Sequence, residues 1–168
     1  MTRRAFTVVE LLVVIGVIAL LASMVLPAMW QARAEARLAR CRSNLRQLGV
    51  ALRVYLGQSN DVLPVAARLP SLQLNDDPRI CDVLAPYLDD RRAFQCPADL
   101  KDYYEREGSS YEYNSREGGR RVGDSFLSRR WGESGLFVLF DYEPFHGKPG
   151  EPGATNFLFA DGHVGDLE

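Results

Sequence analysis

The chain has 168 residues, enough for one membrane segment and one domain of roughly 100 residues. Its charge is divided unevenly: residues 1–56 carry eight Arg and two Glu (+6), and residues 57–168 carry twelve basic and twenty acidic side chains (−8), which together give the net charge of −2. An acidic domain of this kind argues against nucleic-acid binding. There is no GxSxG, HExxH or phosphate-loop motif, so we expect no enzyme.

The first feature along the chain is an apolar segment of 21 residues, Phe6 to Leu26, which contains one charged residue, Glu10. As a helix it would be about 30 Å long, the thickness of a hydrocarbon core. A carboxylate in lipid costs on the order of 3 kcal/mol. We therefore expect a membrane-spanning helix in which Glu10 pairs with a group outside the lipid.

The start of the chain resembles the leader of type IV pilins and type II secretion pseudopilins, which carry a prepilin-type cleavage and methylation segment. A short basic leader with Arg3 and Arg4 precedes Ala5, and Phe6 would be the first mature residue, with Glu10 as the fifth. The family usually has Gly where Ala5 stands. The resemblance implies cleavage between Ala5 and Phe6 and methylation of the new terminus. The alternative is an uncleaved signal anchor.

An amphipathic stripe follows Pro27, with apolar residues every three or four positions from Trp30 through Cys41 to Tyr55. We expect Pro27 to bend the helix or unwind it locally without ending it. Pilins commonly have a proline here. A set of six arginines lies mostly on the other faces and could bind DNA or anionic lipid, but a solvated or subunit-facing role is commoner: Arg33, Arg37, Arg40, Arg42, Arg46 and Arg53.

The rest of the chain predicts a small antiparallel sheet. Apolar strands are expected at 135–142 and 156–160, and Asp161-Gly162 is a hairpin signal. The fold class is therefore α+β and pilin-like, with a long bent N-terminal helix packed on the sheet. The expected parts are a leader (1–5), a membrane and filament-core helix (6–27), the amphipathic half of that helix (28–57) and a periplasmic globular domain (58–168).

Several motifs in this order resemble a group of pilin-like proteins abundant in planctomycetes. They are the Asn-Leu helix running into Tyr55 and Pro64, a Cys-Pro-x-Asp turn at 96–99, a Ser-Tyr-x-Tyr-Asn strand at 110–114 and an Ala-Asp-Gly-His ending at 160–163. In that group a histidine precedes the ending, and His146 stands at a longer distance from it here.

The three cysteines, Cys41, Cys81 and Cys96, lack a CxxC pair, and both histidines are distant in sequence, so we expect no zinc site. If the globular domain lies outside the cytoplasm, one disulfide with one thiol left over is plausible. A Cys41–Cys96 bond would tie the domain to the helix, and a Cys81–Cys96 bond would close a local loop. Three buried free thiols are the third alternative.

Calcium is the one cofactor the sequence suggests, because some pseudopilins bind it in a carboxy-terminal loop. The candidate ligands are Asp141, Glu143, Asp161 and Asp166, whose oxygens suit this ion. The simpler interpretation makes Asp161 a turn residue that tolerates positive φ and Asp141 a carboxylate at a strand end.

The function implied by the resemblance is that of a structural subunit. The chain would be cut by a prepilin peptidase and N-methyltransferase, wait in the inner membrane with its N-terminus in the cytoplasm, and join other subunits through an assembly platform. The filament would be periplasmic or on the cell surface, and its expected role is protein secretion; a surface pilus and an uptake device are the other possibilities. The alternatives are a minor pilin that binds DNA, polysaccharide or a secreted substrate, and a membrane-anchored envelope enzyme.

Overall fold

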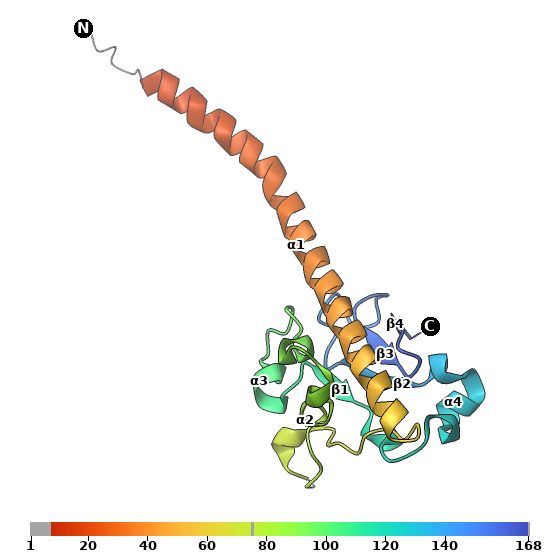
Figure 1. Cartoon of the computed structure of the whole chain (residues 1–168). Coiled ribbons are helices and arrows are strands. Elements are labelled where there is room, and N and C mark those ends of the chain that lie inside the picture. Colours follow the sequence, from red (N-terminus) through yellow and green to blue (C-terminus); the bar gives the residue numbers. More distant parts are fainter. Residues whose placement is uncertain (1–7, 75, 168) are drawn as a thin grey trace. The chain divides into compact units, whose positions relative to one another are not determined.

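The computed structural model describes residues 8–74 and 76–167 (Figure 1). The chain divides into two compact units, Met1–Ala36 and Arg37–Glu168. One element, α1 (Val8–Gln58), begins in the N-terminal unit and ends in the C-terminal unit. Pro27 lies inside α1, so the helix continues through it as expected. α1 ends at Gln58, and Asn60 and Asp61 then take positive φ, which these residue types tolerate better than most.

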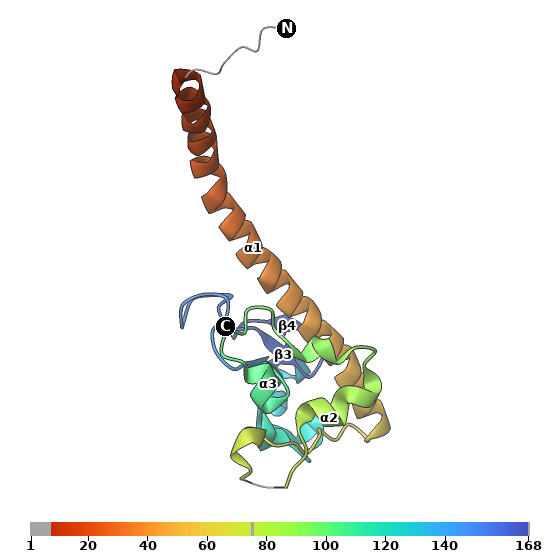
Figure 2. The same cartoon turned by 90° about the vertical axis from the view of Figure 1, so that its left-hand side faces the viewer.

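The C-terminal unit contains a four-stranded antiparallel sheet in the order β1-β2-β3-β4 (Figures 1 and 2). The strands are β1 (Tyr111–Tyr113), β2 (Phe137–Asp141), β3 (Phe157–Phe159) and β4 (Val164–Gly165). In the register Glu112 pairs with Phe140, and Leu158 pairs with both Leu139 and Val164. The α+β fold class and the pilin-like layout predicted from the sequence are confirmed.

Short helices connect α1 to β1 and β1 to β2. The α-helices are α2 (Ile80–Leu84), α3 (Tyr103–Glu107) and α4 (Phe126–Trp131). The 3-10 turns are η1 (Pro70–Leu72), η2 (Ala85–Tyr87), η3 (Arg91–Phe94), η4 (Ser115–Glu117), η5 (Val122–Asp124) and η6 (Glu133–Gly135). Sequence periodicity does not predict α3 and α4, which have only five and six residues. Ser125 caps α4 by accepting a hydrogen bond from the backbone N–H of Leu127.

The core lies between the second half of α1 and the sheet. Leu45, Leu48 and Leu52 of α1 are fully buried, as is Leu158 of β3. Gly49 lets α1 approach β3 closely, because a Cβ at this position would lie 2.9 Å from Leu158 Cδ1. The apolar stripe is therefore confirmed from Cys41 onward, whereas Trp30 near its predicted start is exposed.

The β3–β4 hairpin forms where Asp161-Gly162 predicted it. Gly162 takes the positive φ of the turn, at 90°, and Asp161 does not. Asp161 instead accepts a hydrogen bond from the backbone N–H of His163, at 3.0 Å. The expectation that Asp161 itself adopts positive φ is corrected, although its role as a turn residue holds.

Candidate functional site

The first candidate is the apolar part of α1. Between Val8 and Leu26 every side chain is exposed, and the helix is long and apolar enough to cross a membrane. The large apolar side chains of this segment are 44–75% exposed, with Leu26 at the lower limit and Val8 at the upper. Large apolar surfaces of this kind are typical of helices that contact lipid or another protein.

The processing residues predicted from the sequence, Ala5 and Phe6, lie outside the described residues. Glu10 lies in the first turn of α1, and its side chain is exposed. Between Val8 and Gln31 it is the only charged residue.

The second candidate is a buried cluster in the C-terminal unit. Cys41 comes from α1, Cys96 from the turn after η3, Asp141 from the end of β2 and His146 from the loop after β2. One potential ligand atom from each residue lies within 4.8 Å of the others. Cys41, Cys96 and Asp141 are at most 2% exposed, and His146 is partly buried. We call these four residues the Cys–His–Asp cluster.

The closest contacts inside the cluster join its members in pairs. Cys41 Sγ lies 3.5 Å from Asp141 Oδ1, and Cys96 Sγ lies 3.4 Å from His146 Nε2. The hydroxyl oxygen of Tyr111 lies 3.3 Å from Cys41 Sγ. The sulfur of Cys41 therefore has both a carboxylate and a phenol as neighbours.

Asn156, just before β3, supports the cluster. Its backbone N–H and its side-chain Nδ2 donate to Asp141 Oδ2 at 2.8 and 2.9 Å. Its own Oδ1 accepts a hydrogen bond from Arg42 Nε at 2.8 Å. These bonds hold Asp141 so that Oδ2 is occupied and Oδ1 faces Cys41.

The surroundings shift the pKa values of the acidic groups. A hydrogen bond with Cys41, and then one with His146, lowers the pKa of Cys96 to about 5, although burial opposes the shift. The pKa of Cys41 is raised, first by its hydrogen bond with Cys96 and next by burial. Burial raises the pKa of Asp141 to about 6, against the hydrogen bonds from Asn156. A thiolate, the form of cysteine that binds metals and attacks electrophiles, therefore forms readily at Cys96.

Two thiols, an imidazole and a carboxylate are a donor set that can bind a metal ion. The sequence predicts no zinc site because the cysteines and histidines are far apart along the chain. The fold brings Cys41, Cys96 and His146 together, so their separation in sequence does not exclude a bound metal ion. The alternative use of a thiolate beside an imidazole is nucleophilic attack, but Cys96 is only 1% exposed and a substrate would not reach its sulfur.

The third cysteine lies apart from the cluster. All three cysteines are free thiols in the structure, and Cys81 is buried beside Gly108. A Cβ added at Gly108 would lie 2.6 Å from Cys81 Sγ, so Cys81 packs tightly against this backbone. Cys81 belongs to the core, whereas Cys41 and Cys96 share a polar site.

The structure does not bring together the four carboxylates proposed as calcium ligands. Glu143 accepts hydrogen bonds from Lys101 Nζ and the Tyr103 hydroxyl, and Asp161 Oδ1 lies 2.6 Å from His163 Nδ1. Asp166 Oδ2 accepts from the backbone N–H of Gly153. Within residues 8–74 and 76–167, the Cys–His–Asp cluster is the only group of three or more potential ligands whose donor atoms lie close enough together to hold a metal ion. Asp141 is its one member from the calcium set.

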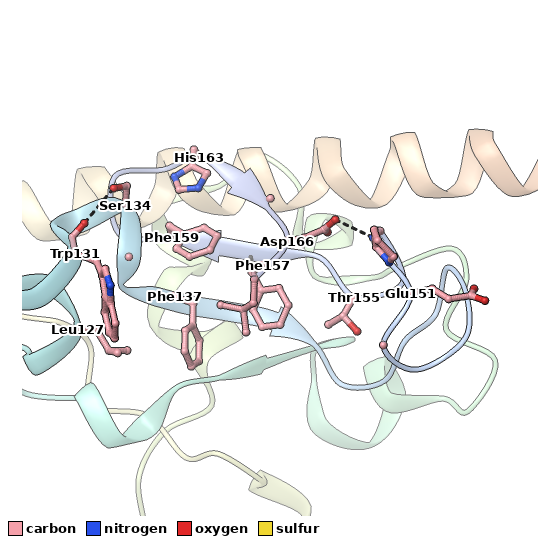
Figure 3. A pocket seen from close by; sticks show the side chains of 16 residues that line it. Leu127, Trp131, Ser134, Phe137, Glu151, Thr155, Phe157, Phe159, His163 and Asp166 are labelled. Carbon is pink, nitrogen blue, oxygen red and sulfur yellow. Dashed lines mark hydrogen bonds between the residues drawn. The ribbon is translucent and has the colours of Figure 1, made fainter.

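A third feature is the aromatic side of the sheet, shown in Figure 3. Phe137, Phe157 and Phe159 line a cavity of about 1110 Å³ together with Trp131 and His163. The ring of His163 stacks on Phe159 with 4.2 Å between ring centroids. This side of the sheet differs in character from the side carrying Leu158, which packs against α1.

His146, Asn156 and Tyr111 are site residues that the sequence analysis did not combine with the cysteines. The sequence predicted only the contact between the two cysteines. Cys41 lies on the apolar stripe of the helix, and a Cys41–Cys96 disulfide was one of the expected pairings. No family model, curated protein or solved structure matches this chain, so the functional argument depends on the residues and their geometry.

Proposed function

We propose that this chain is a pilin-like subunit that is held in the inner membrane by the apolar part of α1 and assembles through it into a filament. The observation that carries the proposal is the exposed apolar segment between Val8 and Leu26. Burying one Val, Leu or Ile side chain contributes about 1.5–3 kcal/mol. A segment with this many such residues is stable only in lipid or against other helices.

Glu10 distinguishes filament assembly from simple anchoring. An anchor works best without a charge, because a carboxylate in lipid costs on the order of 3 kcal/mol. In a filament core the same carboxylate would meet the amino-terminal charge of a neighbouring subunit, once a peptidase has cut between Ala5 and Phe6. A paired buried charge is tolerated and can set the register between helices.

The test of this proposal replaces Glu10 by alanine in the full chain. We expect Glu10→Ala to insert into the inner membrane as before but to lose filament assembly, measured by crosslinking between cysteines introduced into the segment 8–26. Ser23→Ala is the matched control. The Ser23 hydroxyl donates to the carbonyl of Leu20 in the same helix at 2.7 Å, so its removal takes away a polar group without a charge. Assembly of Glu10→Ala at the wild-type level would refute the proposal.

One observation favours a second candidate, in which the subunit also binds polysaccharide. Three phenylalanines and His163 line one cavity on the aromatic side of the sheet. Aromatic rings offer flat apolar surfaces on which sugar rings can pack, and the acidic charge of residues 57–168 disfavours DNA. Phe157→Ala should abolish retention on immobilised polysaccharide while Leu74→Ala, an exposed site outside the cavity, should keep it. Equal retention by both variants would exclude this role.

A further inference from the structure

The Cys–His–Asp cluster has the composition of a zinc site. Cys41, Cys96, His146 and Asp141 supply two sulfurs, one nitrogen and one oxygen, which are the donor types of protein zinc sites. Calcium and magnesium prefer oxygen ligands throughout, so the two thiols argue against either ion. Four side chains complete a tetrahedral shell, as structural zinc sites require.

Two of the distances between donors also fit zinc, and all four donor atoms lie within 4.8 Å of one another. Zinc lies about 2.3 Å from sulfur and about 2.0–2.2 Å from nitrogen or oxygen, so in a tetrahedron a sulfur should lie about 3.5 Å from a neighbouring nitrogen or oxygen ligand. Cys41 Sγ lies 3.5 Å from Asp141 Oδ1, and Cys96 Sγ lies 3.4 Å from His146 Nε2. Both distances therefore match the edges of a zinc tetrahedron.

The groups around the donors behave as an outer shell that orients metal ligands. Both donors of Asn156 bind Asp141 Oδ2, and this leaves Oδ1 as the oxygen turned toward Cys41. Tyr111 places a hydroxyl 3.3 Å from Cys41 Sγ, where it can donate to a thiolate. Carboxylate and thiolate ligands in metal sites are commonly held by such bonds.

The charges of the cluster also call for a cation. Asp141 is 2% exposed, and within the described ranges 8–74 and 76–167 no ion pair with Lys or Arg involves it. Arg42 is near but donates to Asn156 and lies 4.0 Å from Asp166. A divalent ion between the four donors would neutralise most of the charge of the buried carboxylate and two thiolates.

We propose that Cys41, Cys96, Asp141 and His146 bind one zinc ion, which joins the second half of α1 to the sheet. Binding forms two Zn–S bonds: the Cys41 thiol loses its proton to solvent, Cys96 binds as the thiolate, and no electrons are transferred. A disulfide between Cys41 and Cys96 is the competing outcome. It would require an oxidant and would leave Asp141 buried without a cation.

The test uses the full chain purified in detergent without reductant, first with cobalt as the probe and then with zinc. We expect cobalt to give a thiolate-to-metal charge-transfer band and the intense visible bands of a tetrahedral ion. Zinc added afterwards should abolish both, and the dialysed protein should retain one zinc per chain by elemental analysis. Failure to bind cobalt through thiolates, or a Cys41–Cys96 disulfide in peptide mass spectra, would overturn the proposal.

Matched variants locate the ligands. Cys96→Ser and His146→Ala should each lower zinc affinity at least tenfold and alter the cobalt spectrum. Cys81→Ser removes a cysteine that is also buried but lies outside the cluster, so it should bind metal as the wild type does. Loss of metal in Cys81→Ser, or its full retention in Cys96→Ser, would contradict the assignment. The cobalt spectrum of the wild type tests the site even if a variant fails to fold.

Discussion

Cys41 Sγ lies 3.5 Å from Asp141 Oδ1, although the two residues are 100 positions apart in the sequence. Cys41 belongs to the helix that carries the apolar segment, and Asp141 ends β2, one of the two inner strands of the sheet. The contact therefore joins the two principal elements of the C-terminal unit. Both the stability of this unit and its affinity for metal should depend on how closely the helix and the sheet approach each other.

Removal of metal should destabilise the folded chain. A ligand present at a thousand times its dissociation constant stabilises the state that binds it by about 4 kcal/mol, which corresponds to a rise in Tm of roughly 10 °C for a chain of this size. We expect thermal unfolding of the detergent-solubilised protein to shift down by this amount when a chelator is added. Cys81→Ser should show the same shift, and Cys96→Ser, with its lower zinc affinity, should show a smaller one. If the chelator leaves the Tm of the wild-type protein unchanged, no metal ion is bound.

Asn156→Ala should weaken both the fold and the metal site. The change removes the hydrogen bond from Asn156 Nδ2 to the buried Asp141 Oδ2 and the one that Asn156 Oδ1 accepts from Arg42, at a cost of about 1–3 kcal/mol. Loss of an outer-shell partner commonly lowers metal affinity about 10–100-fold. Cobalt titration and thermal unfolding measure the two effects separately. Gln47→Ala, an exposed position on α1, is the control and should change neither quantity.

Gly49→Val should destabilise the contact between α1 and β3. A Cβ at this position would lie 2.9 Å from Leu158 Cδ1 and 3.2 Å from the carbonyl oxygen of Gly162, so the added side chain overpacks the core at a cost of about 1–3 kcal/mol. Gly57→Val is the matched control near the end of the same helix, because nothing lies within 4 Å of a Cβ there. Its effect should stay within about 0.5 kcal/mol. Equal unfolding temperatures for the two variants would contradict the close approach.

Leu48→Ala should be among the most harmful substitutions in α1. Leu48 is fully buried in the core, and truncation of a buried leucine to alanine costs about 2–5 kcal/mol. Val50→Ala, two positions further along, changes a side chain that is 65% exposed and should alter stability by less than about 0.5 kcal/mol. The free energies of unfolding of the two variants, measured in denaturant, check which face of α1 is buried against the core.

Local patterns were enough to predict most of the fold. The apolar repeat from Cys41 to Tyr55 predicted the buried face of α1, and the apolar runs before and after residues 143–155 predicted β2 and β3. These elements are predictable because burial imposes a period on neighbouring residues. The short helices α3 and α4 were missed because five or six residues are too few to show such a period.

The Cys–His–Asp cluster could not be predicted in the same way. Its members come from four segments, and no two of them are spaced as in a known metal motif. His146 lies in a loop rich in Gly and Pro. The path of this loop depends on hydrogen bonds within the C-terminal unit, such as the bond from the backbone N–H of His146 to the carbonyl oxygen of Ala154. Side chains that meet only through tertiary packing leave no periodic trace in the chain.

The positions of the buried residues in α1 have a practical consequence. From Val8 onward, the first buried residue of the helix is Cys41, and the compact C-terminal unit begins at Arg37. A protein shortened to start near Arg37 would thus keep every buried side chain of the helix while losing the exposed apolar segment. Metal binding and sheet packing could then be tested on the C-terminal unit by itself, apart from any role of that segment.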